Sequence, residues 1–192
     1  MVVLWDSLGT LLDVGSVHER YPGWLEQVLH HGAALTLMGE FAPFESLAEA
    51  ANPQALRVLR AELRPHDDAA QALDVLEDAG IRSWIVTNGG RESTEQALGD
   101  LTSRFDGIVS IDDVEAWKPA QSPYLEALRR AGLEAAEACL IAAHGWDVHA
   151  AGRYGLRAVW VDRLEERWLL PGEPPGQRAS NLPDAARLAR GR

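Results

Sequence analysis

Short apolar runs alternate with amphipathic segments along most of the chain. Five runs rich in Val, Ile or Trp are bounded by Gly, Asp, Asn or Arg, which is typical of buried strands: Val2–Asp6, Ser83–Thr87, Gly107–Ile111, Cys139–Ala143 and Ala158–Asp162. Between the later runs lie helical patterns, most of which end at a glycine: Asp67–Ala79, Glu92–Leu101, Pro123–Ala131 and Val148–Tyr154. This alternation predicts an α/β fold with a Rossmann-like, doubly wound parallel sheet of about five strands.

The alternation is interrupted between the first two runs. About seventy residues there show helical patterns and no strand pattern, over Tyr21–Met38, Phe44–Ala51 and Pro53–Leu63. We therefore expect a small helical cap over residues 15–65, inserted into a core made of residues 1–14 and 66–192. Near the C-terminus, Pro171–Gln177 predicts a surface loop, and Asn181–Ala189 predicts a last short helix.

Composition narrows the classes of function. The formal net charge of −11 over 192 residues disfavours nonspecific binding to nucleic acid or to anionic membranes. The single cysteine, Cys139, lies in an apolar run, which excludes a disulfide within the chain and fits a reducing compartment. No apolar stretch reaches the length of a membrane span, and the first residues lack a signal-peptide pattern. We expect a cytoplasmic protein that acts on a small molecule.

Lys118 is the only lysine, whereas the other 17 members of the Lys and Arg count are arginine. An ammonium is a compact point charge, unlike the planar guanidinium, and suits a site that holds carboxylates at close range. The alternative is a surface lysine without function. Ligands of an open parallel sheet bind beyond the carboxyl ends of the strands. Chemically active residues gather at those predicted ends: Asp6, Thr87, Asn88, Asp112, Asp113, Lys118, His144 and Asp147.

Asp6 directly follows an apolar strand, where a carboxylate serves as a nucleophile, a metal ligand or a helix N-cap. Lys118 can keep Asp6 ionised, because a nearby opposite charge favours the charged form. Asp147 could activate water, orient Lys118 or ligate a metal.

Two turns near Asp6 can bind an anion. Gly9 and Thr10 predict a sharp turn whose backbone N–H groups face an anionic group. Thr87 and Asn88 can donate hydrogen bonds to a carboxylate or a phosphate.

Taken together, these segments resemble the haloacid dehalogenase superfamily, and within it the L-2-haloacid dehalogenase branch more than the phosphatases. Residues 6–14 are similar to that branch's Asp-x-Tyr-Gly-Thr-Leu-Phe-Asp-Val, and residues 86–89 match its (Ser/Thr)-Asn-Gly. Lys118-Pro119 with Tyr124, and Gly145-Trp146-Asp147 with residues 155 and 160–163, match its later motifs. Residues 37–44 resemble its cap segment. The resemblance runs over nearly the whole chain.

The resemblance implies a hydrolase in which Asp6 forms a covalent aspartyl ester and Lys118 holds it. It implies that Asp147 positions the hydrolytic water or Lys118, and that His144 is a further catalytic candidate. The substrate would be a small anionic organic molecule, with no cofactor required, magnesium possible and a homodimer plausible. The expected substrate-binding residues are Leu8, Gly9, Thr10, Thr87, Asn88, Gly89 and Trp146.

Three positions depart from the family pattern. Leu8 stands where the phosphatases carry an acidic proton donor and the dehalogenases a tyrosine. Leu25 stands where the dehalogenases carry a halide-binding arginine, for which Arg20 is a weak substitute. His144 follows Ala142 and Ala143 where the family has Ser-x-Asn, and serves either as a base or as a hydrogen-bonded residue at a strand end. The insert is also shorter than in the family, which predicts a less enclosed site.

Two other functions stay open. One is a magnesium-dependent phosphatase, in which Asp6, the Leu8 carbonyl and Asp147 would ligate the metal. Leu8 argues for poor turnover by such an enzyme. The other is a binding protein on an inactivated scaffold, motivated by Leu25 and Ala142.

Overall fold

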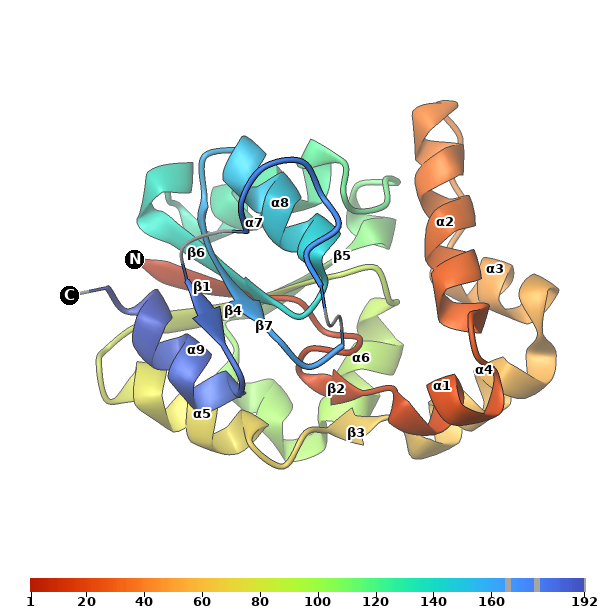
Figure 1. The fold of residues 1–192 in the computed structure, drawn as a ribbon, viewed down its shortest axis with the longest axis horizontal. Coiled ribbons are helices and arrows are strands. Elements are labelled where there is room, and N and C mark those ends of the chain that lie inside the picture. Colours follow the sequence, from red (N-terminus) through yellow and green to blue (C-terminus); the bar gives the residue numbers. More distant parts are fainter. Residues whose placement is uncertain (165–166, 175–176, 192) are drawn as a thin grey trace.

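The computed structural model describes residues 1–164, 167–174 and 177–191, and its centre is a parallel sheet of six strands (Figure 1). Along the sheet the strands are β5 (Gly107–Ser110), β4 (Arg82–Thr87), β1 (Val2–Trp5), β6 (Ala138–Ala142), β7 (Arg157–Val161) and β8 (Arg178–Ala179). The five predicted strands are confirmed to within one residue at each end. The edge strand β8 was not predicted, because two residues carry no periodic pattern.

Helices cover both faces of this sheet, which confirms the doubly wound class (Figure 1). One face packs against α5 (Ala69–Glu77), α6 (Arg91–Leu98) and α9 (Leu182–Ala189), and the other against α7 (Gln121–Ala131) and α8 (Gly145–Arg153). Strand β1 shows why the strands appear in the sequence as continuous apolar runs. Val3 and Trp5 enter one core while Val2 and Leu4 enter the other, so both faces are buried.

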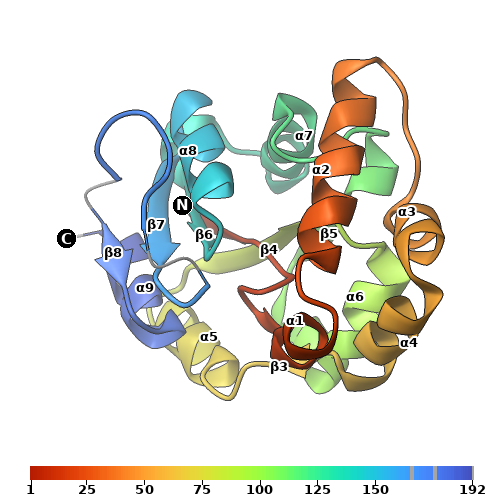
Figure 2. The same cartoon turned by 45° about the vertical axis from the view of Figure 1, so that its right-hand side comes forward.

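The insert after β1 is helical, with α1 (Gly15–Arg20), α2 (Trp24–Leu37), α3 (Phe44–Ala51) and α4 (Pro53–Glu62) standing to one side of the sheet (Figure 2). The helix expected over Tyr21–Met38 starts later than predicted, because Gly23 adopts a left-handed φ of 79°. Asn52 caps α4 by accepting hydrogen bonds from the N–H groups of Gln54 and Ala55.

The expectation of no strand inside this interval was wrong. The short strands β2 (Leu12–Asp13) and β3 (Arg64–Pro65) pair antiparallel where the chain leaves the sheet and where it returns. These two strands lie at the boundaries expected for the cap. The division of the chain into a core and a cap domain stays a prediction. The expected loop at Pro171–Gln177 falls partly outside the described residues. Within the described residues, no helix combines the length and the apolarity that crossing a membrane requires.

Trp117, in the loop between β5 and α7, packs against the insert. Trp117 is fully buried, and its indole N–H donates to the Ala42 carbonyl at 3.0 Å. Its backbone N–H donates to the Thr36 hydroxyl at 3.0 Å, and its ring lies against Gly32 of α2. A Cβ at Gly32 would lie 2.1 Å from the ring, so only glycine allows α2 to approach this closely.

We therefore predict that Gly32→Ala destabilises the protein, although alanine favours a helix by about 1 kcal/mol. Overpacking against the indole should outweigh that gain and lower the free energy of unfolding by about 1–2 kcal/mol, measured by urea denaturation. Gly152→Ala in α8 is the matched control, because a Cβ there meets nothing within 4 Å. The packing argument fails if Gly32→Ala is as stable as Gly152→Ala.

Candidate active site

Asp6 lies directly after β1 and is nearly buried, with 4% of its surface exposed. Its Oδ1 accepts a hydrogen bond from Lys118 Nζ at 2.7 Å, and its Oδ2 accepts one from the Thr10 hydroxyl at 2.6 Å. The Thr10 hydroxyl in turn accepts from the backbone N–H of Ala143 at 2.8 Å. Both carboxylate oxygens are therefore fixed in place.

Lys118 reaches Asp6 from the loop between β5 and α7. Its ammonium is 1% exposed and donates to three oxygens: Asp6 Oδ1 at 2.7 Å, the Val86 carbonyl at 2.9 Å and Asp147 Oδ2 at 2.5 Å. Three acceptors match the three N–H groups of an ammonium. The single lysine thus occupies a position that a planar guanidinium would not fit.

Asp147, in the first turn of α8, completes the charge cluster. It is fully buried, and besides Lys118 it accepts a hydrogen bond from the Tyr124 hydroxyl. Tyr124 lies on α7, six residues after Lys118, and was not predicted as a site residue. Its place in the Lys-Pro…Tyr motif was the available signal.

These contacts decide the charges of the cluster. Burial raises the pKa of Asp6, but Lys118, His144 and Thr10 together hold that pKa below its ordinary value. Burial lowers the pKa of Lys118, yet Asp147 and Asp6 raise it above its usual range. Burial and the charge of Asp6 raise the pKa of Asp147, against the opposing effect of Lys118. Asp6 is therefore ionised and Lys118 protonated near neutral pH.

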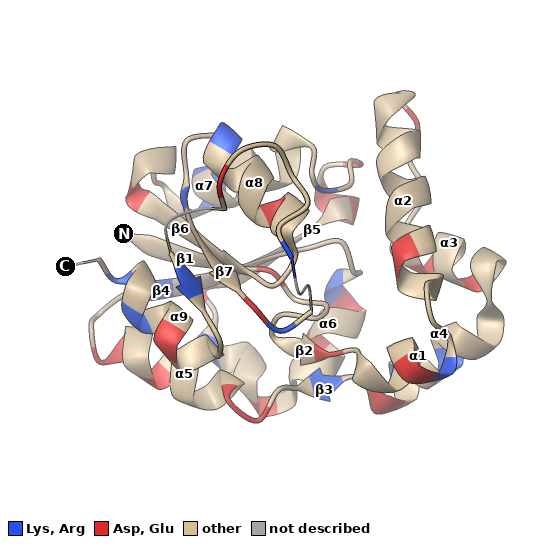
Figure 3. Ribbon diagram, in the orientation of Figure 1, with Lys and Arg blue, Asp and Glu red and all other residues tan. Residues whose placement is uncertain are grey.

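The cluster places one buried positive charge in a chain that is acidic as a whole. Acidic residues are spread over helices of both the core and the insert, in keeping with the net charge of −11 (Figure 3). Lys118 is enclosed between two carboxylates, so its charge acts on both Asp6 and Asp147.

His144 lies beside Asp6 at the end of β6. Its Nε2 is 3.0 Å from the Leu8 carbonyl and 3.9 Å from Asp6 Oδ2, and its ring stacks on Trp146. A carbonyl oxygen can only accept a hydrogen bond, so Nε2 of His144 is the donor in this contact. In the neutral imidazole the other nitrogen, Nδ1, is then a hydrogen-bond acceptor. His144 is thus both hydrogen-bonded at the strand end and close to the carboxylate.

The turn after β4 adds further polar groups. The Thr87 hydroxyl lies 2.5 Å from the Ser7 hydroxyl and accepts from the Gly89 N–H at 2.8 Å. Asn88 Oδ1 accepts from the Lys118 backbone N–H at 2.9 Å. That contact fixes the amide, and among the described residues nothing accepts a hydrogen bond from its Nδ2. The Asn88 amide is therefore both a brace for the lysine loop and a donor for a ligand.

A cavity of about 470 Å³ reaches the charge cluster at Lys118, while Asp6 and Asp147 are not among its lining residues. Lys118, His144 and Trp146 form its floor on the core side, and Leu25, Leu29 and Ala33 of α2 form its roof. Exposed Glu26 and His30 lie at its solvent side. Leu25 is 1% exposed and presents an apolar surface to the cavity.

Arg20 does not replace the missing arginine in this cavity. Its guanidinium donates to both carboxylate oxygens of Glu62, at 2.7 and 2.9 Å, on the exposed side of the insert. Asp113 is likewise engaged elsewhere, by Arg91 and Arg130.

Not every expected substrate-binding residue lines this cavity. The Leu8 side chain and Gly89 line a different cavity, described below. Gly9 has a φ of 79°, and a Cβ there would clash with Leu164 at 2.4 Å, so its role is in the turn. Thr10 braces Asp6, and Trp146 is a cavity wall as expected.

The three oxygens expected for magnesium do not fit that metal. Asp6 and Asp147 both bind the Lys118 ammonium, and the Leu8 carbonyl accepts from His144. An ammonium between the two carboxylates takes the place where a shared cation would bind. Among the described residues there is also no group of three or more His, Cys, Asp or Glu side chains arranged to hold a metal.

A family profile described as "Haloacid dehalogenase-like hydrolase" matches residues 41–161, which is more than half of the chain. The chain belongs to the haloacid dehalogenase-like hydrolase family. The resemblance drawn from the motifs is thereby confirmed, and so is the assignment to the hydrolases.

Within this family, the chain can be compared with 2-haloacid dehalogenases and with a phosphatase. The chain is 29% identical to (S)-2-haloacid dehalogenase 1 of Pseudomonas sp. (strain CBS-3), over 96% of this chain and 94% of that protein. It is also 29% identical to the (S)-2-haloacid dehalogenase of Pseudomonas putida, over 84% of each. The L-2-haloacid dehalogenase of Xanthobacter autotrophicus, solved with chloropropionic acid covalently bound, superimposes with a TM-score of 0.85 and 26% identity over 100% of this chain and 99% of that one. A phosphatase of the family from Thermococcus onnurineus superimposes with a TM-score of 0.69 at 22% identity, which supports the fold alone.

Removing the Lys118 ammonium should reveal how much free energy it costs to bury the Asp6 and Asp147 carboxylates. We predict that Lys118→Met lowers the free energy of unfolding by about 3–5 kcal/mol at pH 8, because Asp6 and Asp147 are left buried without a counter-charge. Their pKa values in the folded variant then lie above the unfolded values. The variant is therefore most stable below the unfolded pKa and loses stability as pH rises.

Urea denaturation of both proteins at pH 5 and pH 8 checks this. The deficit of Lys118→Met should be smaller at pH 5, and adding Asp147→Asn should recover part of it. An equal deficit at both pH values would show that the two carboxylates do not depend on the ammonium.

Proposed function

We propose that this chain is a 2-haloacid dehalogenase that hydrolyses the carbon–halogen bond of a small halogenated carboxylic acid. The observation that supports it is the Asp6 carboxylate held by Lys118, with no proton donor at position 8. Attack on carbon needs an ionised, oriented carboxylate and little more.

The first step is a displacement at the carbon next to the substrate carboxylate. One oxygen of Asp6 forms a bond to that carbon while the carbon–halogen bond breaks, and the halide leaves with the bonding electrons. A halide leaves without a proton, so the side chain of Leu8 is no handicap. The product of this step is an ester in which one oxygen of Asp6 is bonded to carbon 2 of the acid.

The second step hydrolyses that ester. Water attacks the Cγ carbon of Asp6 and the bond from Cγ to the ester oxygen breaks. One of the two water protons is passed to that leaving oxygen, so that a 2-hydroxy acid departs, and the other is released to solvent as Asp6 returns to a carboxylate. We assign the relay of the water proton to His144, whose Nε2 lies 3.9 Å from Asp6 Oδ2. Asp147, whose oxygens bind Lys118 and Tyr124, acts by orienting the ammonium.

The substrate carboxylate would be held at the turn after β4. The Asn88 amide supplies a donor there, whereas the N–H groups of Gly9 and Thr10, which were expected to face an anion, already donate to the Leu12 and Ser7 carbonyls. Helix α2 closes the cavity above the substrate with Leu25 and Leu29, which exclude water from the displacement step. The reaction uses no metal or organic cofactor, and whether the chain forms a dimer stays a prediction.

A magnesium-dependent phosphatase is the weaker alternative. The ammonium between its two presumptive carboxylate ligands, and an apolar residue where such an enzyme needs an acid, both argue against it. A phosphate-release assay with and without magnesium distinguishes the two activities.

We predict that the purified protein releases halide from a short 2-haloacid without added metal, and that Asp6→Asn reduces this release by about a thousandfold or more. In heavy-oxygen water the product of the first turnover should carry the unlabelled oxygen of Asp6. Repeated turnover should then label the Asp6 carboxylate, detected by peptide mass spectrometry. Ser46→Ala, at an exposed position on α3, is the control variant. Absence of halide release from short 2-haloacids would contradict the proposal.

The apolar Leu25 predicts a strong dependence on the leaving group. A departing halide meets no guanidinium in this cavity, so bromide should leave much faster than chloride. Leu25→Arg should raise kcat for the chloro-substrate by about tenfold or more, because a nearby positive charge stabilises the departing anion. The ratio of kcat for the bromo-substrate to kcat for the chloro-substrate should then become smaller.

Leu25→Met, of similar volume and without charge, is the control and should leave that ratio unchanged. The role of Leu25 is disproved if Leu25→Arg folds normally and the bromide-to-chloride ratio stays as it was.

A further inference from the structure

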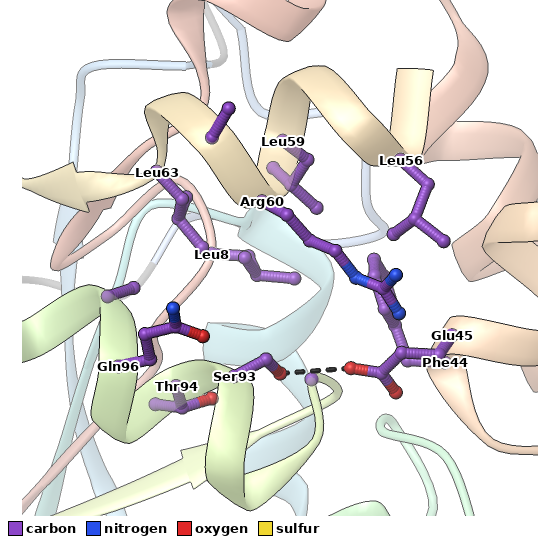
Figure 4. Close-up of a pocket in the computed structure, with 13 residues that line it drawn as sticks. Leu8, Phe44, Glu45, Leu56, Leu59, Arg60, Leu63, Ser93, Thr94 and Gln96 are labelled. Carbon is purple, nitrogen blue, oxygen red and sulfur yellow. Dashed lines mark hydrogen bonds between the residues drawn. The ribbon is translucent and has the colours of Figure 1, made fainter. Parts of the chain in front are cut away.

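A second cavity, of about 240 Å³, lies between helices α3 and α4 of the insert and α6 of the core (Figure 4). We call it the α4/α6 chamber. Among the described residues it shares no lining residue with the catalytic cavity. One part of its lining is apolar and consists of Leu8, Phe44, Leu56, Leu59, Leu63 and Ala97, while Glu45, Arg60, Ser93, Thr94 and Gln96 make the other part polar. The apolar wall suits a hydrocarbon or an aromatic group.

The mouth of the α4/α6 chamber carries opposite charges. Glu45 on α3 and Arg60 on α4 flank it, and Figure 4 shows the Arg60 guanidinium directed toward the Glu45 side. Glu45 Oε1 accepts from the Ser93 hydroxyl at 3.0 Å, which fixes the carboxylate. Within the described part of the chain, Arg60 and Glu45 form no ion pair, either with each other or with another side chain. Two charges of opposite sign therefore face the opening without neutralising each other.

The surroundings restrict the charge of a ligand. An open hollow outside the chamber shares Glu45 and Arg60 and adds Asp112, Glu92 and Arg91. Arg91 is neutralised by Asp113 at 2.7 Å, so the excess charge near the mouth is negative. A simple anion would be repelled by that excess, and a simple cation would leave Arg60 without a partner. A zwitterion with an apolar tail matches both charges and the wall.

We propose that the α4/α6 chamber binds a free α-amino acid with an apolar side chain. The side chain fills the space lined by Leu56, Leu59 and Leu63. The carboxylate of the ligand accepts hydrogen bonds from Arg60, and its ammonium donates to Glu45. This site does not depend on the proposed dehalogenase activity.

An occupant would also touch the catalytic loop. Leu8 contributes its side chain to the chamber, and its carbonyl accepts the hydrogen bond from His144. Filling the chamber would therefore restrain the residue that holds His144 beside Asp6.

Isothermal titration calorimetry on the full chain tests the proposal with L-leucine and two analogues. 4-Methylpentanoate lacks only the ammonium of leucine, and 3-methylbutylamine lacks only its carboxylate. Leucine should bind at least about tenfold more tightly than either, because each analogue forfeits one charge-assisted hydrogen bond. L-Alanine, which keeps the zwitterion but not the tail, should bind weakly.

Four variants complete the design. Arg60→Gln and Glu45→Gln should each weaken leucine binding by about tenfold. Arg57→Gln and Glu49→Gln lie on the same two helices, are exposed and do not line the chamber, so they should bind leucine as the unaltered chain does.

Circular dichroism establishes that each variant is folded before titration. No heat from leucine at millimolar concentrations, equal affinity for either analogue, or unchanged binding by Arg60→Gln and Glu45→Gln would each overturn the site. Halide release measured in parallel separates this result from the fate of the proposed activity.

Discussion

A buried ammonium between two buried carboxylates is the interaction on which the rest of this structure depends. Lys118, Asp6 and Asp147 are at most 4% exposed and come from three separate segments of the chain. Removing such charges from water costs several kcal/mol per ion, which only close pairing offsets. Pairing requires that β1, β4 and β6 lie side by side, because Asp6, the Val86 carbonyl and Asp147 surround one nitrogen. The two-sided apolar packing of the sheet supplies the free energy that holds this arrangement.

The same cluster determines which chemistry the site can support. The ammonium donates to both carboxylates and cannot bridge to a phosphoryl group as a divalent cation does. The apolar residue at position 8 removes a proton donor for an alkoxide leaving group. What remains is an ionised, nearly buried Asp6, which suits displacement of a group that leaves as a stable anion. The site is thus specialised by what Lys118 and Leu8 exclude as much as by Asp6.

The sequence predicted the sheet and the charge cluster because each follows from local pattern and general topology. Strands buried on both faces give continuous apolar runs, and residues after those runs meet at one edge. Contacts between segments that are distant along the chain leave no such pattern in the sequence, so they were not predicted. The Tyr124 hydrogen bond to Asp147, the Leu8 carbonyl as partner of His144, and the direction of the Leu8 side chain all depend on packing. Strands of two residues, such as β8, are too short for any periodicity.

The insert and the charge cluster are mechanically joined. Trp117 precedes Lys118 in the chain, and its ring contacts Gly32 on α2, the helix that also carries Leu25. A rotation of α2 away from the sheet would therefore pull on the residue next to the ammonium and weaken its hold on Asp6.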